Sequence, residues 1–243
     1  MELSSPVTEI FNASIQERVV PVSWTVADVI PIRKTKNDLR PISLTPILSK
    51  TLEHFVAEWI MSQIRHLVGR KQFGSLAGLS TTHALLSFFH HLYGTTDQSD
   101  QCVRVLLLDF SKAFDRIDHH ILIKKMEEMA IDPVLIAWVK QFLTGRKQRV
   151  KIGKYTSSLE PVNGGVPQGT VFGPILFMIM INELLVDWDD RWKYVDDSSV
   201  PETLSRNQDS DFQTILEGIT QWCCFWKNNP NFPPMITPQA SSL

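Results

Sequence analysis

The sequence lacks the features that would place this protein outside the ordinary globular class. Only three of its 243 residues are cysteines, Cys102, Cys223 and Cys224, and no Cys/His spacing fits a zinc site. The longest apolar stretch, Val171–Ile181, is interrupted by glycine and proline and is too short to span a bilayer. The first residues show neither a basic start nor an apolar run. We therefore expect no secretory signal, no membrane association and an intracellular, reducing compartment.

Net charge is nearly absent as well, because 24 basic side chains are opposed by 26 acidic ones. A formal charge of −2 is not what a nucleic-acid-binding protein usually carries. Positive charge is nevertheless gathered in two short segments, residues 33–40 and 146–154. Each segment is compatible with a solvated surface or with a surface that binds a phosphate backbone, for which local positive charge is required.

Two segments that indicate β-structure end in carboxylates. Val103–Asp109 is a largely apolar run that predicts a buried strand, and Tyr194–Asp197 places two adjacent acids in a tight hairpin. Taken alone, either acid can simply mark a turn at the surface. If both strands deliver their carboxylates to one sheet edge, the acids form an oxygen-ligand site for hard divalent cations. Two such cations are the machinery of nucleotidyl transfer.

A glycine-rich segment, Gly164–Thr170, lies between the two acidic strand ends. Glycines allow the backbone to approach a ligand closely, because no Cβ stands in the way. Pro174 suits the first turn of a helix. The following residues, Ile175–Leu185, are apolar almost all round, so we expect this helix to be buried.

Three segments resemble, in order, consecutive polymerase motifs of reverse transcriptases, with the character of non-LTR (LINE-like) retrotransposons. These segments are Leu108–Asp115, Gly165–Gly169 and Tyr194–Asp197. The resemblance covers roughly residues 10–230. Upstream segments that resemble the fingers region of the same family are Ala27–Ile32, Asp38–Leu44, Gln72–Gly74 and Ser80–Leu85.

Strands that alternate with helices predict an α+β fold with a mostly antiparallel sheet. The resemblance implies a right-hand polymerase with fingers at residues 1–100 and a ferredoxin-like antiparallel palm sheet, accompanied by helices, at 101–205. Residues 120–160 would return to the fingers. We expect residues 206–243 to hold a partial post-palm segment and an irregular tail, so that the thumb is missing or truncated.

Start and stop signals predict the boundaries of several elements. Thr45-Pro46, Ser80 and Asp132-Pro133 each have the chemistry of a helix start, with a capping side chain or a proline at the first helical position. A further helix is expected at about 120–130. The alternation in Gln148–Gly153 predicts a basic strand.

The resemblance also implies a metal site. Asp109 and Asp196 would each ligate two Mg²⁺ ions, for which Mn²⁺ can substitute, and the backbone carbonyl of Phe110 would complete one coordination shell. One ion would lower the pKa of the primer 3′-hydroxyl, and the other would neutralise the triphosphate. Asp197 follows Asp196 directly, so in an extended hairpin its side chain points to the opposite face. We therefore expect Asp197 to have a supporting catalytic role.

The nucleotide-binding residues are likewise implied by the resemblance. Phe114 corresponds to the aromatic steric gate whose ring leaves no room for a 2′-hydroxyl and so selects dNTPs. The alternative is that Phe114 is a core phenylalanine. Gln168 would contact the nucleotide, whereas Arg40 and Lys34 would hold its phosphates. Arginine suits that role through its bidentate geometry and lysine as a point charge.

The activity implied is that of an RNA-directed DNA polymerase, which extends a DNA primer with dNTPs on an RNA template in the nucleus or cytoplasm. The sequence also departs from the family. Ala77 and Leu79 stand where relatives usually carry basic residues, and the stretch between Lys34 and Asp38 is shorter than is common. A decayed retroelement-derived domain that binds nucleic acid without polymerising is therefore a second hypothesis. An RNA-dependent RNA polymerase is a third, against which Phe114 and the Tyr-Val-Asp-Asp hairpin argue.

Overall fold

The chain divides into two compact units. The computed structural model describes residues 3–36, 38–97, 100–110, 112–205, 208–226 and 236–242. Unit 1 comprises residues 1–67 and 114–179, and unit 2 comprises residues 68–113 and 180–243. The division falls within helix α6 (Phe172–Ile181). The expected fingers and palm boundaries remain predictions.

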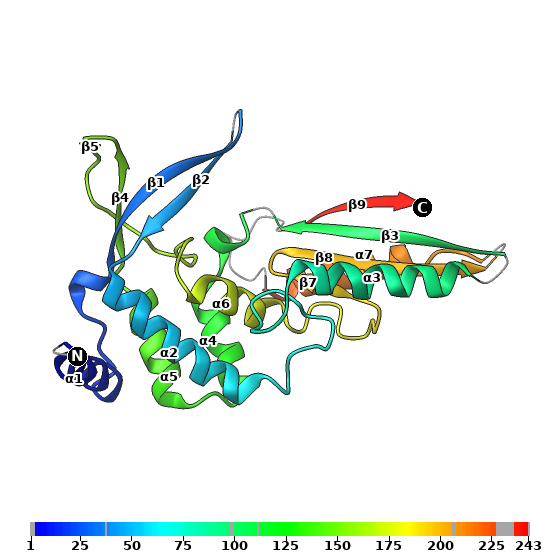
Figure 1. The fold of residues 1–243 in the computed structure, drawn as a ribbon. Coiled ribbons are helices and arrows are strands. Elements are labelled where there is room, and N and C mark those ends of the chain that lie inside the picture. Colours follow the sequence, from blue (N-terminus) through cyan, green and yellow to red (C-terminus); the bar gives the residue numbers. More distant parts are fainter. Residues whose placement is uncertain are drawn as a thin grey trace. The chain divides into compact units, whose positions relative to one another are not determined.

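Unit 1 combines helices with a small mixed sheet (Figure 1). Its helices, besides the first turns of α6, are α1 (Ser4–Gln16), α2 (Ile47–Ile64), α4 (His119–Glu128) and α5 (Pro133–Leu143), with the short 3-10 helices η1 (Val22–Trp24) and η2 (Phe114–Arg116). Its strands are β1 (Val26–Thr35), β2 (Asp38–Leu44), β4 (Lys147–Ile152), β5 (Tyr155–Thr156) and β6 (Glu160–Pro161). The order is β2-β1-β4-β5, β6 also pairs with β4, and only β1 and β4 run parallel.

An aromatic cluster forms the centre of unit 1. Trp138 on α5 is fully buried and stacks on Phe142, with ring centroids 5.7 Å apart. Phe172, at the start of α6, lies against both rings. The Trp138 indole N–H donates to the hydroxyl of Ser14 at 2.9 Å, which ties α1 to α5. Burial of these large rings supplies the main hydrophobic stabilisation of the unit.

Two of the three predicted helix starts are confirmed, and one is wrong. The Asp132 carboxylate accepts from the Val134 amide, and the Ser80 hydroxyl accepts from the His83 amide. Helix α2 begins after Pro46, which occupies the N-cap position without any side-chain cap. The Thr45 hydroxyl is buried rather than placed on the helix amides.

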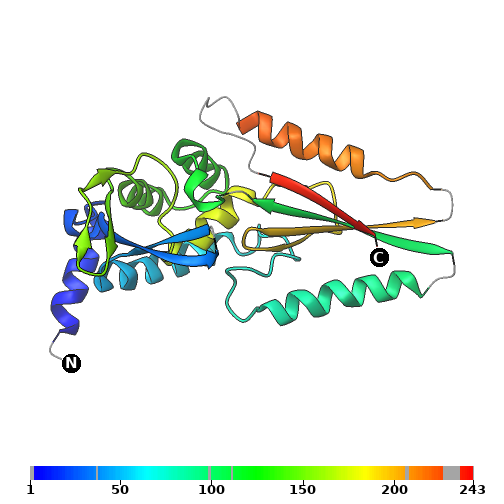
Figure 2. The ribbon, with the colours of Figure 1, turned by 90° about the horizontal axis from the view of Figure 1, so that it is seen from above.

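Unit 2 is built on a four-stranded sheet that two helices flank (Figure 2). Its elements are α3 (Thr81–Thr96), β3 (Gln101–Phe110), β7 (Trp192–Tyr194), β8 (Asp197–Ser205), α7 (Phe212–Trp226) and β9 (Ile236–Ser242). The strand order is β7-β8-β3-β9, and every pairing is antiparallel. Leu92 of α3 packs on Val103 and Val105 of β3. The expected α+β class with an antiparallel sheet is therefore confirmed.

The expected irregular tail is wrong for residues 236–242, which form β9 along the edge of β3. A free sheet edge offers unpaired N–H and C=O groups, and pairing with it depends on backbone more than on side-chain periodicity. This explains why a segment without strand periodicity pairs there. Residues 227–235 of the expected tail lie outside the described residues. In the part of the chain that is described, no helix is long and apolar enough to cross a membrane.

Candidate active site

Three carboxylates gather at one end of the β3–β8 pair in unit 2. Asp109, near the end of β3, is the direct cross-strand partner of Asp197, the first residue of β8. Directly paired residues of an antiparallel ladder lie on the same face of the sheet. Asp109 and Asp197 are both exposed, whereas the next pair along the ladder, Leu108 and Ser198, is buried. The register therefore presents the acids to solvent.

Asp196 belongs to the turn that precedes β8. Tyr194 of β7 pairs with Asp197, so Val195 and Asp196 form a two-residue turn, and Val195 adopts a φ of 54°. Such turns match the right-handed twist of the strands that they join. The expectation that Asp197 points to the face opposite that of Asp196 assumed an extended hairpin. The backbone is not extended at Val195 and Asp196, because these residues form the turn. The turn places Asp197 directly opposite Asp109.

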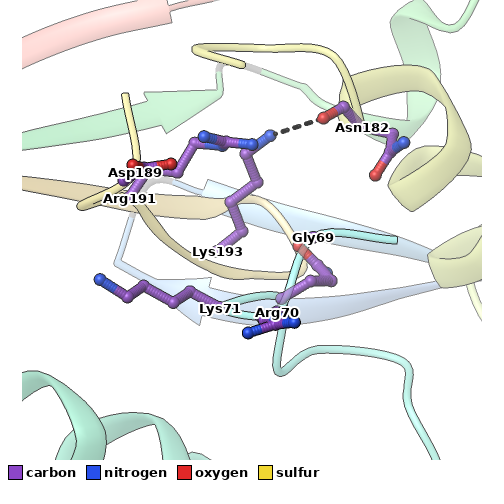
Figure 3. A pocket seen from close by; sticks show the side chains of 8 residues that line it. Gly69, Arg70, Lys71, Asn182, Asp189, Arg191 and Lys193 are labelled. Atoms are coloured by element: carbon purple, nitrogen blue, oxygen red, sulfur yellow. Dashed lines mark hydrogen bonds between the residues drawn. The ribbon is translucent and has the colours of Figure 1, made fainter. Parts of the chain in front are cut away.

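A buried lysine fastens this hairpin to the end of α6. Lys193 of β7 is only 5% exposed. Its ammonium group donates to the backbone carbonyls of Ile181, Asn182 and Leu184 at 2.7, 3.2 and 2.7 Å. Figure 3 shows the bond to Asn182. The last carbonyls of a helix have no partner within the helix, and a cation there also interacts favourably with the helix dipole. Lys193 thus holds β7 in place three residues before Asp196.

The segment Lys71–Gly74 supports the hairpin from its other side. The Lys193 amide donates to the carbonyl of Lys71, and the Phe73 amide donates to the carbonyl of Lys193. A Cβ added to Gly74 would lie 2.2 Å from the Val195 nitrogen, so only glycine allows this approach to the turn. The Gln72-Phe73-Gly74 motif is therefore a structural support for the acidic turn.

The acids suit a hard divalent cation without forming a complete cage. Among the described residues, no three His, Cys, Asp or Glu side chains converge into a protein-only metal site. Mg²⁺ is usually held by one or two carboxylates, together with water and substrate phosphates. Exposed carboxylates on Asp109 and Asp197, with half-exposed Asp196 in the adjoining turn, fit that pattern. Phe110 is buried at the end of β3, beside Asp109.

In unit 1, the glycine-rich loop 164–171 is held by contacts from four directions. The Ser43 amide of β2 donates to the carbonyl of Gln168 at 2.7 Å, and His119 bonds the carbonyl of Gly165 at 2.7 Å. The amides of Gly165 and Val166 donate to carbonyls in the 114–117 segment. A Cβ on Gly165 would lie 2.7 Å from the Asp115 carbonyl oxygen, and its φ is +74°. The loop is therefore a defined structure rather than an open connection.

Glu53 supplies the fourth contact from inside the core. This carboxylate is fully buried on α2, and it accepts from the Val171 amide at 3.0 Å and from the Ser49 hydroxyl. Burial raises the pKa of Glu53 above its ordinary value of 4.5. Arg146, also buried, donates to the Phe142 carbonyl, and burial lowers its pKa to about 10 while the nearby Glu53 opposes that shift.

Phe114 and Gln168 lie beside this loop. The ring of Phe114 is half-buried, 5.5 Å from the ring of Phe177, and it faces Gly173 at the start of α6. The Gln168 side chain donates to the carboxylate of Asp115 at 3.0 Å. Unit 1 thus brings these two predicted nucleotide-binding residues together around η2.

The predicted phosphate-binding cations lie on the β1–β2 hairpin of the same unit. Lys34 and Arg40 are both exposed, and Arg40 pairs with Ile32 across the strands. In the second basic segment much of the charge is engaged. Arg149 bonds Asp28 at 2.7 Å, which lowers the pKa of that carboxyl, and Lys151 lies 3.7 Å from it. The segment 146–154 is therefore only partly available to phosphates.

Three residues that shape these sites were not assigned a role from the sequence: Glu53, Asp115 and Lys193. Asp115 lies within the first polymerase-like motif, but its bond to Gln168 spans 53 positions. Glu53 and Ser49 are the polar residues on a helix face that is otherwise apolar, which was a usable signal for a buried acid. Lys193 lies between Trp192 and Tyr194, and its position in the sequence does not reveal its partners.

Comparison with known proteins places the chain among polymerases. The family model described as reverse transcriptase (RNA-dependent DNA polymerase) matches residues 32–229. The RNA-directed DNA polymerase from mobile element jockey of Drosophila melanogaster is 28% identical over 239 residues, which cover 89% of this chain and 26% of that protein. The probable RNA-directed DNA polymerase from transposon X-element of the same organism is 30% identical over 186 residues, which cover 73% of this chain and 20% of that protein. The chain spans about a quarter or less of these relatives.

Solved structures show the same fold at low sequence identity. Apo telomerase from Candida tropicalis, truncated from the C-terminal domain, matches with a TM-score of 0.61 and 12% identity over 96% of this chain and 54% of that chain. Telomerase from Candida albicans, in complex with a fragment of telomeric RNA, matches with a TM-score of 0.63 and 11% identity. This match covers 97% of this chain and 45% of that chain. These likenesses support the polymerase-type fold and concern the fold alone.

Replacing Lys193 with methionine tests its structural role. The change leaves three backbone carbonyls without their charged donor, so we expect the free energy of unfolding to fall by about 3 kcal/mol. Lys124→Met is the matched control, because Lys124 forms an exposed pair with Glu128 at 3.6 Å, and such pairs contribute little. Urea unfolding measures both variants. Equal destabilisation by the two changes would contradict the assigned role.

Glu53→Gln tests the buried carboxylate through pH. Because the folded-state pKa of Glu53 is raised, the stability linked to its protonation is fully present below the ordinary value of 4.5 and is lost as pH rises through the folded pKa. Glutamine keeps an acceptor for the Val171 amide but does not titrate. We therefore expect the wild-type protein to lose stability relative to Glu53→Gln as pH rises above 4.5 and through the raised folded-state pKa.

Urea unfolding across that pH range measures this difference. Glu127→Gln, on an exposed position of α4, is the control for removal of one carboxylate from the surface. A stability difference between wild type and Glu53→Gln that does not change with pH would show that the Glu53 carboxyl does not titrate differently on folding.

Proposed function

Because the chain belongs to the reverse transcriptase (RNA-dependent DNA polymerase) family, we propose that it carries the nucleotide-addition centre of an RNA-directed DNA polymerase. The observation that carries this proposal is the pairing of Asp109 with Asp197, with Asp196 in the adjoining turn. The substrates are a DNA primer on an RNA template and dNTPs. The relatives that the chain matches are polymerases of mobile elements, which supports this assignment.

The acids of unit 2 are the proposed cation-binding groups. Asp109 and Asp196 hold the divalent ions, the Phe110 carbonyl is a further oxygen donor, and Asp197 adds negative charge on the same face as Asp109. When two Mg²⁺ or Mn²⁺ ions are bound, they supply activation of the primer 3′-hydroxyl and neutralisation of the triphosphate charge. Lys193 and Gly74 keep the acidic turn in position.

The loop and aromatic residues of unit 1 are the proposed nucleotide contacts. Phe114, anchored on Phe177 and half-exposed, forms the wall beneath the sugar. Gln168 contacts the nucleotide, and its bond to Asp115 fixes the orientation of its amide. Ser43 and Glu53 hold the loop backbone on either side of Gly169. A positioned loop reduces the entropy lost when the nucleotide binds.

The proposed phosphate contacts are Arg40 and Lys34. Both side chains are exposed on adjoining strands, so neither has to be uncovered before it meets a triphosphate. Arg40 offers a planar fork that matches two phosphate oxygens, and Lys34 offers a compact point charge.

Primer extension tests the function and separates it from the alternatives. The 243-residue chain is incubated with poly(rA)/oligo(dT), Mg²⁺ and either dTTP or UTP. Extension with dTTP in preference to UTP supports the proposal, whereas extension with UTP favours an RNA-dependent RNA polymerase. A second measurement, on a primer that ends in a dideoxynucleotide, asks whether dTTP and Mg²⁺ together stabilise the complex.

The second hypothesis, nucleic-acid binding without polymerisation, rests on exposed Ala77 and half-exposed Leu79 in place of basic residues. It is supported if template and primer bind but neither extension nor dTTP-dependent stabilisation of the complex occurs. That result would overturn the proposed polymerase activity.

Asp109→Asn and Asp196→Asn should each abolish extension. Each change removes one carboxylate from the cation site, and loss of several kcal/mol of transition-state stabilisation corresponds to a rate at least about 100-fold lower. The unfolding midpoint should remain nearly unchanged, because neither carboxylate is buried. We expect a smaller loss for Asp197→Asn, since both proposed cation ligands, Asp109 and Asp196, remain. Glu127→Gln controls for loss of surface charge, and wild-type rates in the first two variants would refute the assignment.

Phe114→Val should raise UTP incorporation relative to dTTP. The smaller side chain removes the wall beneath the sugar and leaves the acids of unit 2 unchanged. Phe114→Tyr is the matched control, because it keeps the ring and should keep the preference for dTTP. The ratio of incorporation rates is the measurement. If Phe114→Val lowers stability without moving this ratio, Phe114 is a core residue.

A further inference from the structure

Apart from the acidic turn, unit 2 contains a polar pocket with a volume of about 430 Å³. Figure 3 shows the residues that line it. It lies between the segment Gly69–Gln72 and the residues that join α6 to β7. Its lining carries four cationic side chains against one carboxylate, that of Asp189. The cations are Arg70, Lys71, Arg191 and Lys193. A pocket of this size with an excess of positive charge favours an anionic ligand.

Two of the four cations already have partners within the protein. Lys193 directs its three donors at backbone carbonyls. Lys71 is ion-paired with Asp190, which balances its charge, and its ammonium group lies 3.9 Å from the centre of the Trp192 ring. The two arginines therefore carry the charge that we assign to the binding of a ligand.

One edge of the Arg191 guanidinium is held by hydrogen bonds, and the other edge points into the pocket. Its Nη1 donates to the carbonyls of Val186, at 3.0 Å, and Trp188. In the described part of the chain, its Nε and Nη2 donors make no hydrogen bond. Nη2 lies 4.0 Å from the place that a Cβ on Gly69 would occupy. Burial lowers the pKa of Arg191, and the negative charges of Asp189 and Asp187 oppose that shift. An anion bound at the open edge of the guanidinium would replace hydration that is lost on burial.

Arg70 and Gly69 form the facing wall. Arg70 is exposed, and no ion pair to it is seen among the described residues. Gly69 does not have a positive φ and has no atom closer than 4.0 Å to an added Cβ. Its lack of a side chain is therefore not demanded by the backbone, and it leaves open the space in front of the Arg191 guanidinium.

We propose that this pocket binds a phosphate group, with Arg191 and Arg70 as donors from opposite walls. Guanidinium groups match phosphate oxygens in a bidentate arrangement, and such charge-assisted hydrogen bonds are stronger than neutral ones. The phosphate belongs either to the backbone of bound RNA or to a free phosphate ligand. The RNA source rests on the proposed function, whereas phosphate binding as such does not.

The position of the pocket along the chain favours the RNA source. Residues 69–72 lead directly into Phe73 and Gly74, which support the turn that carries Asp196. An RNA phosphate held at the pocket would therefore be anchored to the same hairpin as the acids. Such a contact would help to keep the template in register with the site of nucleotide addition.

Two variants test the pocket without disturbing the loop that Arg191 holds. Arg70→Ala removes one donor, and Gly69→Leu fills the space in front of Arg191 without changing the charge. Arg65→Ala, an exposed arginine in unit 1, is the matched control for loss of one positive charge. The unfolding midpoint of each variant is measured first. Binding of a fluorescent 20-nucleotide RNA and of inorganic phosphate is then titrated over a range of salt concentrations.

We expect Gly69→Leu and Arg70→Ala each to weaken RNA and phosphate binding by roughly tenfold, the effect of losing one charge-assisted contact. Each should reduce the salt dependence of RNA binding by roughly 0.7 in the log–log slope. Arg65→Ala should leave phosphate binding unchanged. If folded Gly69→Leu binds both probes as tightly as the wild-type protein, the proposal that the pocket binds phosphate is overturned. This holds even if Arg70→Ala weakens RNA binding through its loss of charge.

The two sources of phosphate give different results. Loss of phosphate binding with unchanged RNA affinity would overturn the RNA source and assign the pocket to a free ligand. Asp109→Asn, which disables the proposed polymerase centre, should leave the titration with inorganic phosphate unchanged. Failure of the polymerase proposal and failure of the pocket proposal are therefore measured separately.

Discussion

The antiparallel pairing of β3 with β8 is the constraint on which the acidic site depends. Nine residue pairs join the two strands, from Gln101 opposite Ser205 to Asp109 opposite Asp197. Because side chains alternate between faces, a slip of one residue would move Asp109 to the buried face and Leu108 into water. The cost of exposing the apolar residues of β3 therefore fixes where the carboxylates lie. Hydrophobic burial in the sheet sets the geometry of a polar site.

Buried charges act at both ends of α6, each with the sign that suits the helix dipole. In unit 1, the Glu53 carboxylate accepts from the Val171 amide just before the helix begins. In unit 2, the Lys193 ammonium binds the carbonyls at and after its end. Negative charge is favourable at a helix N-terminus and positive charge at a C-terminus. Each charge loses its hydration on burial, so each is compatible with the fold only because backbone groups replace that water.

The division of basic side chains between internal partners and the surface explains how a chain with a net charge of −2 presents cations to phosphates. Part of its positive charge satisfies internal partners: Lys193 binds carbonyls, Arg146 binds Phe142, and Arg149 pairs with Asp28. Most of the lysines and arginines in the described part of the chain, Arg40 and Lys34 among them, stay exposed. Binding of a phosphate backbone depends on these local groups rather than on the sum of charges.

Local sequence signals predicted the features that depend on neighbouring residues. Ser80 and Asp132 cap their helices because the amides they accept from lie within three positions. The order of the polymerase motifs identified the family, and the strand ending near Asp109 was confirmed. The α+β class followed from the same patterns. The caps and the strand end are properties of short windows of sequence, whereas the family and the fold class follow from the order of such windows along the chain.

The tertiary structure alone decided the features whose partners lie far apart in the sequence. Glu53 and Val171 are 118 positions apart, and no local pattern links an acid on a helix to that amide. The edge of β3 that accepts β9, and the turn that sets Asp197 opposite Asp109, likewise appear only once strands are paired. The sequence by itself determined which chemical groups are present and which segments form elements. Long-range backbone pairing and burial determined which of those groups meet, because both depend on surfaces that exist only in the folded chain.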